Sequence, residues 1–167
     1  MKKHILDLVE QARLLQYPYK NQPAATPVEI SRLEEASKQQ LGYNVPPFYG
    51  EFLQVCDGMA CNGIQLYGST TKPIVGLEKR ASLLEGLVEA NMLWRAGEEG
   101  AHNADYVYFA ESGDYLYCHY LPDDRYQIVD RVTLEPIYEP AVFDTAEELL
   151  TQILNHMLDR YGVEDEA

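Results

Sequence analysis

The 167-residue sequence has few basic residues, few cysteines and no long hydrophobic segment. It contains 13 Lys and Arg residues against 27 Asp and Glu residues, which gives a formal net charge of -14. A negative field of this size disfavours nucleic acid and anionic membranes as direct ligands, and it favours basic partners or plain solubility. No apolar run approaches the roughly 18 residues that a membrane span needs. Asp7, Glu10 and Arg13 also interrupt any apolar signal region near the N-terminus.

The three cysteines, Cys56, Cys61 and Cys118, are an odd number in a chain that is long enough to fold without disulfides. Reduced thiols in a cytoplasm explain them most simply, so we expect a cytoplasmic protein. The length fits one domain with its own hydrophobic core, and we expect that single domain to cover residues 1–167.

Two helices are predicted near the N-terminus. Apolar residues recur at helical spacing from residue 5 to residue 15, so an N-terminal helix is predicted within residues 1–20. Thr26 and Glu29 form a capping box, and Pro27 needs no amide partner in the first turn. A second helix is therefore predicted from residue 26 to about residue 41.

The next segment is rich in residues that begin or end regular structure. Pro46 and Pro47 begin a third helix, which is predicted over residues 47–56 and ends at Asp57-Gly58. Asn62-Gly63 tolerates the positive φ angles of a tight turn, so a strand that ends at Gly68 is predicted to follow it. A fourth helix, with Trp94 in the core, is predicted over residues 78–95.

From residue 105 the hydrophobic period changes to two, which is typical of strands. Two strands are predicted, with Ser112-Gly113 as a two-residue turn that places Phe109 opposite Leu116. This register predicts a hairpin with one apolar face and one tyrosine face. A third strand is predicted over residues 126–131.

The C-terminal part is predicted to be helical. Asp144 and Glu147 have the spacing of a capping box in its aspartate form, so a last helix is predicted to begin there. Residues 162–167 are predicted to form a frayed acidic tail. His102 and His156 are predicted to be surface residues. Together these elements predict an α+β fold, with an antiparallel sheet of about four to six strands packed against helices.

The order of these motifs resembles the SUKH superfamily, and most closely its YrhA-like bacterial branch. The resemblance rests on residues 42–46, 52–53, 57–63, 66–68, 109–114, 126–131 and 143–150, and it covers roughly residues 26–158. Val45 and Asp57 stand where family members commonly have leucine and asparagine. That superfamily includes yeast cell-wall-assembly regulators and many bacterial toxin-immunity proteins. The resemblance implies an α+β fold and action by binding other proteins, and it implies no catalytic residues.

Catalytic and metal sites find little support in the sequence. Cys56, Cys61, Cys118 and His119 could in principle bind zinc, but their spacing is loose and adjacent strand residues point to opposite faces. Ser112 lies in a predicted turn without the glycine-flanked elbow of a hydrolase. We therefore expect no cofactor, no metal and no enzymatic activity.

The tyrosine face of the predicted hairpin is the candidate binding surface, because tyrosine offers a large contact area at small entropic cost. The alternative is that helices cover this face and make its tyrosines part of the core. The candidate partner-binding residues are Tyr106, Tyr108, Tyr115, Tyr117 and His119, with Asp105, Glu111 and Asp114 at the rim.

Three hypotheses about function follow from these observations. The first is a non-catalytic immunity-type protein that neutralises a basic toxin, such as a nuclease, by stoichiometric binding. The second is a housekeeping scaffold or regulator related to the cell-wall-assembly regulators. A metal-dependent hydrolase is the distant third. The sequence does not indicate an oligomeric state.

Overall fold

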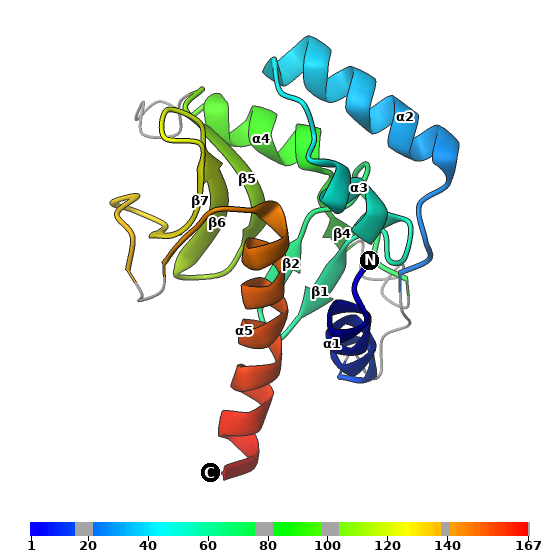
Figure 1. The fold of residues 1–167 in the computed structure, drawn as a ribbon, viewed down its shortest axis with the longest axis vertical. Coiled ribbons are helices and arrows are strands. Elements are labelled where there is room, and N and C mark those ends of the chain that lie inside the picture. The colour runs from blue at the N-terminus through cyan, green and yellow to red at the C-terminus, as the bar shows by residue number, and fades with distance from the viewer. Residues whose placement is uncertain (16–21, 76–81, 98–103, 138–140, 167) are drawn as a thin grey trace.

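The computed structural model describes residues 1–15, 22–75, 82–97, 104–137 and 141–166, with side chains up to residue 159 (Figure 1). The helices are α1 (Lys3–Leu14), α2 (Pro27–Ala36), the π-helical segment η1 (Ser37–Leu41), α3 (Pro47–Leu53), α4 (Leu87–Arg95) and α5 (Ala146–Glu166). The strands are β1 (Met59–Cys61), β2 (Ile64–Leu66), β3 (Lys72–Pro73), β4 (Leu83–Leu84), β5 (Tyr106–Glu111), β6 (Tyr115–Tyr120), β7 (Arg125–Asp130) and β8 (Val142–Phe143).

Six of the strands form one antiparallel sheet in the order β1-β2-β5-β6-β7-β8, and β3 and β4 form a small second sheet. This confirms the predicted α+β fold. Helix α5 crosses the front of the large sheet in Figure 1, with α1 packed beside it. Helix α4 packs on β5. In the described part of the chain, no helix is long and apolar enough to span a membrane.

The predicted start of α2 is confirmed in detail. The Glu29 amide donates to the Thr26 hydroxyl at 3.1 Å, and the Thr26 amide donates to the Glu29 carboxylate at 3.1 Å. The helix continues as η1 and ends at Gly42, whose φ of 62° is the left-handed conformation that glycine adopts without strain. Helix α3 begins at Pro47 as predicted but ends at Leu53, earlier than the predicted residue 56.

The turn at Asn62-Gly63 is also confirmed, with φ angles of 51° and 78°, and it joins β1 to β2. Strand β1 was not predicted. The close contact between two chain segments explains one of the glycines: a Cβ at Gly68 would lie 2.8 Å from the Asp57 carbonyl oxygen. Gly58 has a φ of 87°, which also favours glycine.

Two predicted helix starts are wrong. The helix predicted over residues 78–95 is limited to α4, because Leu83 and Leu84 pair with β3 instead. Residues 78–81 lie outside the described part. At α5, the Glu148 amide donates to the Thr145 hydroxyl at 3.2 Å, so Thr145 is the cap in place of Asp144. The residues predicted to form an acidic tail belong to α5 up to Glu166.

The predicted register of the β5-β6 hairpin is wrong for two reasons. The turn is longer than the predicted two residues Ser112-Gly113, and β5 contains a β-bulge. Glu111 lies opposite Leu116, and Tyr108 lies opposite Cys118, with the register shifting between Tyr108 and Ala110. A bulge adds one residue to a strand, so it exchanges the faces of the residues beyond it. Tyr108 therefore shares a face with Cys118, while Tyr117 points to the opposite face.

The buried side chain of Asn91 on α4 holds this irregular strand in place. Its amide group donates to the Tyr108 carbonyl oxygen at 2.8 Å and accepts from the Tyr108 amide at 2.7 Å. It also donates to the Leu87 carbonyl oxygen at 2.8 Å. Strand β2 pairs with β5 at Ala110 and Glu111, and the following Tyr67 amide donates to the Phe109 carbonyl oxygen at 2.9 Å. The Asn91 amide thus satisfies two backbone groups next to the bulge, as a neighbouring strand would.

A polar cluster ties α2, the end of α3 and β3 together. The buried Asp57 carboxylate accepts from the Ser69 amide at 2.7 Å and from the Ser69 hydroxyl at 2.9 Å. The Lys72 ammonium bridges Asp57 and Glu29. Burial alone would lower the pKa of Lys72, but its bonds to these two carboxylates outweigh burial and raise the pKa. The hydrogen bond from Lys72 lowers the pKa of Glu29, and the bond from the Thr26 amide adds to this effect.

We predict that Asn91→Leu lowers the free energy of unfolding by about 2–4 kcal/mol, because it leaves two buried backbone groups without partners. Urea unfolding followed by circular dichroism measures this change. The matched control is Asn155→Leu on α5, where the side chain has no hydrogen bond to a described residue, and it should change stability much less. Equal losses in the two variants would contradict the role given to Asn91.

We predict that Lys72→Met lowers the free energy of unfolding at neutral pH by about 1–3 kcal/mol, because Asp57 and Glu29 lose their shared cation. A carboxylate whose folded pKa is lowered stabilises the fold above its unfolded pKa, and this contribution disappears as pH falls through the folded pKa. The difference between wild type and variant should therefore shrink below about pH 4.5. Urea unfolding at the two pH values tests this, with the exposed Lys38→Met as the control.

Candidate functional site

The predicted tyrosine face does not exist as one exposed surface. Tyr108 and Tyr117 are fully buried, and His119 is buried as well. The Tyr108 ring packs against Trp94 of α4 at 5.7 Å, whereas the Tyr117 hydroxyl lies 3.0 Å from His156 of α5. Helices therefore cover both faces of the hairpin, and the predicted patch is divided between them because of the bulge.

The remaining members of the predicted patch are partly or fully exposed but dispersed. Tyr106 is half-buried and stacks on Tyr108, with ring centres 5.9 Å apart. Tyr115 is half-buried on the face of Tyr117. Asp105 and Asp114 are exposed near opposite ends of the hairpin. Of the predicted acidic rim, Glu111 lines a cleft.

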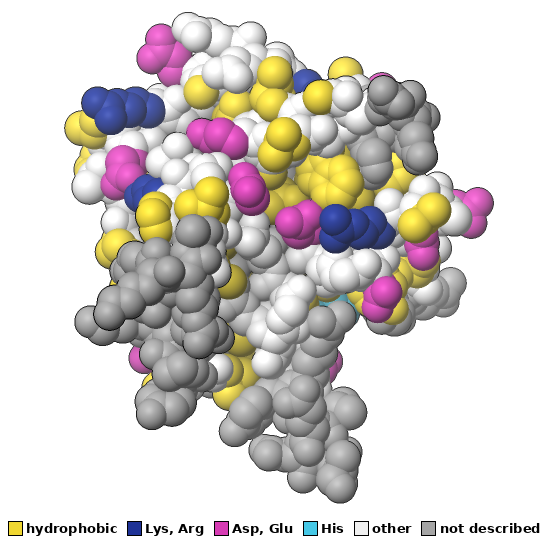
Figure 2. Space-filling view, turned by 180° about the vertical axis from the view of Figure 1, so that it is seen from behind, with side chains coloured by type: hydrophobic (Ala, Val, Ile, Leu, Met, Phe, Trp, Pro, Cys, Tyr) yellow, Lys and Arg dark blue, Asp and Glu magenta, His cyan; other side chains and the backbone are white. Residues whose placement is uncertain are grey.

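That cleft lies between α4 and the adjoining ends of β2, β4 and β5. It has a volume of about 250 Å³ and is lined by Tyr67, Glu85, Ala90, Leu93, Trp94 and Glu111. Leu93 is 68% exposed, and the neighbouring Met92 and Leu83 are also exposed. Figure 2 views the molecule from the side opposite α5, and there hydrophobic side chains gather among acidic ones. We call this site the acidic aromatic cleft.

A chain of hydrogen bonds positions the indole ring of Trp94 in the cleft. The Trp94 Nε1 group donates to the Tyr67 hydroxyl at 3.1 Å. The Tyr67 side chain in turn acts to lower the pKa of the Glu111 carboxyl group. Tyr67 is fully buried, and its backbone carbonyl oxygen accepts from the Tyr49 hydroxyl. Hydrogen bonds to buried residues of the core thus hold the aromatic side chains of the cleft in place.

The surroundings of Glu111 in the cleft shift the pKa of its carboxyl group. Burial raises its pKa, the Arg131 guanidinium and the Tyr67 hydroxyl oppose the rise, and the nearby Glu85 carboxylate adds to it. Arg131 lies 3.8 Å from Glu111, and its guanidinium sits 5.0 Å above the Trp94 ring. The carboxylates of Glu85 and Glu111 therefore repel each other in a site that is partly shielded from water.

Sequence reasoning missed most of this cleft. Trp94 was expected in the core, and Glu85 was expected within a helix that begins later than predicted. One signal was available: Leu87, Asn91 and Trp94 follow a helical stripe, and Leu93 falls outside it. A large exposed leucine beside the only tryptophan indicates a contact surface.

His119 takes part in a separate chain of hydrogen bonds, on the face of the sheet opposite to Tyr108. Its Nδ1 atom lies 2.7 Å from the Tyr43 hydroxyl, and its Nε2 atom lies 2.8 Å from Asp124. The His119 ring also stacks on Tyr126 at 4.0 Å. Burial raises the pKa of Tyr43 far above its usual value, so its hydroxyl stays protonated and acts as a structural partner. His156, predicted on the surface, is half-buried, and His102 lies outside the described residues.

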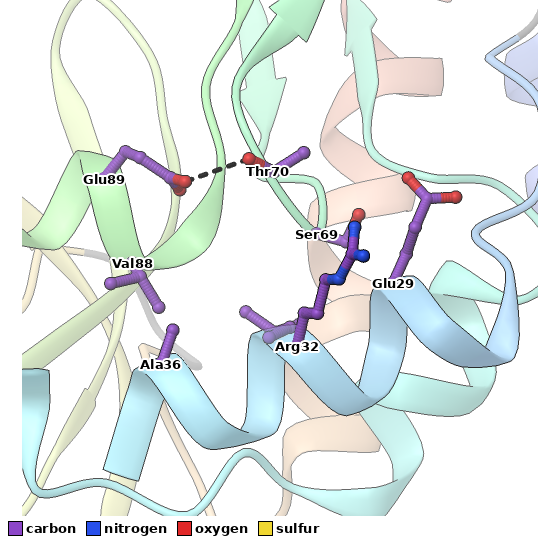
Figure 3. Close-up of a pocket in the computed structure, with 8 residues that line it drawn as sticks. Glu29, Arg32, Ala36, Ser69, Thr70, Val88 and Glu89 are labelled. Carbon is purple, nitrogen blue, oxygen red and sulfur yellow. Dashed lines mark hydrogen bonds between the residues drawn. The ribbon is translucent and has the colours of Figure 1, made fainter. Parts of the chain in front are cut away.

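A second cavity, of about 210 Å³, lies between α2 and α4 (Figure 3). Its acidic groups are bonded within the protein: Glu89 accepts from the Thr70 hydroxyl at 3.0 Å, and Glu29 binds Lys72. Arg32 points toward Ser69 between these groups in Figure 3. The cavity carries charges of both signs and has no aromatic wall, so we regard the acidic aromatic cleft as the better candidate.

The cysteines do not form a metal site within the described residues, where no group of three or more His, Cys, Asp or Glu side chains is close enough to hold an ion. Cys56, Cys61 and Cys118 are free and buried. Burial raises the pKa of each thiol, that of Cys61 to about 11, so they are poor nucleophiles at neutral pH.

We predict that Glu111→Gln increases the free energy of unfolding at pH 7 by roughly 0.5–1 kcal/mol, because it removes a partly buried charge. A carboxyl group whose folded pKa is raised contributes stability at low pH that is lost as pH rises through the folded pKa. The advantage of the variant should therefore shrink as the pH falls toward about 5. Urea unfolding at both pH values tests this, and a variant less stable than wild type at pH 7 would contradict it.

Comparison of the chain with protein-family models finds no match, and comparison with curated proteins finds none either. The resemblance to the SUKH superfamily therefore rests on the sequence motifs and remains a prediction.

Proposed function

We propose that this protein is a non-catalytic module that binds a basic protein through the acidic aromatic cleft. The observation that carries the proposal is the exposed Leu93 and half-buried Trp94 beside Glu85 and Glu111. Tryptophan, tyrosine and arginine side chains near the centre of a patch are enriched among the residues that supply most of the binding energy of protein interfaces. Carboxylates beside them select a partner of positive charge.

The proposed mechanism is occlusion. The net charge of -14 accelerates encounter with a basic partner, and the cleft then holds that partner in a stoichiometric complex. If the partner is a toxin such as a nuclease, whose working surface is basic because its substrate is anionic, the complex covers that surface. This is the immunity-type role that the SUKH resemblance implies, and a cytoplasmic location is part of the proposal.

Buried thiols with raised pKa values support a role without catalysis. The His119 chain supports the same conclusion, because its Tyr43 hydroxyl is buried and protonated and its Asp124 end is exposed to water. The buried thiols and the His119 chain could in principle activate a substrate, but both are structural parts of the fold in this proposal. The proposal assigns no catalytic residue.

The proposal is tested by expressing the full chain together with the protein encoded by the neighbouring gene. We expect survival of cells that the neighbouring protein otherwise kills, and a 1:1 complex in size-exclusion chromatography. The double charge reversal Glu85→Lys with Glu111→Lys should abolish both. The matched control Glu34→Lys with Glu35→Lys, on the exposed side of α2, makes the same change in net charge and should leave both intact.

Equal killing with and without the wild-type protein, together with the absence of a complex, would contradict the immunity role. Protection that the cleft variant and the control variant provide equally would show that another surface binds the partner.

A further inference from the structure

The guanidinium group of Arg131 lies beside the acidic aromatic cleft and contacts two of its lining residues. The Arg131 guanidinium lies over the Trp94 ring at 5.0 Å and 3.8 Å from the Glu111 carboxylate. It also donates to the Ser112 carbonyl oxygen at 2.7 Å. Arg131 is held at the side of the cleft by this last bond, and it does not line the cavity.

The charges in the cleft are not balanced. Glu85 and Glu111 both line it, and Glu85 forms no ion pair with any residue in the part of the chain that the structure describes. Arg131 is the one cation that approaches Glu111 there. The neighbouring Glu85 adds to the electrostatic cost of ionising Glu111. One further positive group between the two carboxylates would remove this repulsion.

The cavity is also the right size for a side chain. Its volume of about 250 Å³ lies below the roughly 300–1,000 Å³ of pockets that take drug-sized ligands. One wall is the indole of Trp94, which offers a flat surface, and Leu93 and Ala90 provide apolar contacts for an alkyl stem. Tyr67 and Glu111 add polar groups to the lining.

We infer that the cleft receives one arginine side chain of the partner protein, with its guanidinium between Glu85 and Glu111 and its plane against Trp94. The inference rests on the proposed function, because it names the group by which the basic partner is recognised. Arginine fits better than lysine, since its planar fork can donate to two carboxylates and stack on an aromatic ring at the same time.

Trp94 makes this inference directly measurable, because it is the only tryptophan of the chain and its fluorescence reports on the cleft. The probe is the tripeptide acetyl-Gly-Arg-Gly-amide, titrated into the full-length protein. We expect a saturable change in fluorescence with a dissociation constant on the order of 1 mM, as suits a ligand of this size. The same peptide with citrulline, which has nearly the same shape but no charge, should bind at least about 10-fold more weakly.

Variants of the cleft should change the affinity in opposite directions. Glu85→Gln and Glu111→Gln should each weaken binding of the arginine peptide by about fivefold or more, because each removes a charged acceptor. Arg131→Gln should strengthen it, because it removes the competing cation. The control Glu34→Gln changes an exposed carboxylate on α2 and should leave the affinity unchanged. Circular dichroism confirms that each variant is folded.

Failure to see a saturable change up to about 10 mM peptide, or equal binding of the citrulline peptide, would overturn the inference. If the basic partner protein still binds in that case, the proposed function stands and only the arginine assignment fails. If the arginine peptide binds as expected but the partner protein does not, the arginine site stands and the proposed function fails.

Discussion

The contact between Asn91 and the backbone of Tyr108 is the interaction on which the rest of the structure depends. Strand β5 carries a bulge at the end of its pairing with β2, and an unpaired backbone next to it would be costly in a buried position. The Asn91 amide pairs with both Tyr108 groups and so docks α4 onto the sheet. This docking places Trp94, three residues further along α4, at the edge of the cleft.

The bulge also decides which aromatic residues remain available for a partner. With a regular hairpin, the tyrosines of β5 and β6 would lie on one face. With the bulge, Tyr108 packs under Trp94 while Tyr117 packs toward α5, and both are fully buried. On α4, by contrast, the apolar side chains of Met92 and Leu93 are exposed near Glu85 and Glu111.

The acidic aromatic cleft combines features that oppose stability with features that suit binding. Glu111 is partly buried near a second carboxylate, which raises its pKa, and Leu93 is largely exposed to water. Natural proteins tend to break stabilising rules of this kind at functional sites. The hydrogen bond from Trp94 to Tyr67 keeps the site rigid, which limits the entropy lost when a partner binds.

The sequence alone determined the features that depend on a few neighbouring residues. The capping box at Thr26, the proline start of α3, the Asn62-Gly63 turn and the presence of strands β5 and β6 depend on nearby residues, so they were predicted correctly, and with them the α+β fold. The tertiary structure decided the bulge, the covering of both sheet faces and the acidic aromatic cleft. These depend on contacts such as that between Asn91 and Tyr108, which join residues far apart in the chain, and hydrophobic periodicity carries no information about such pairs.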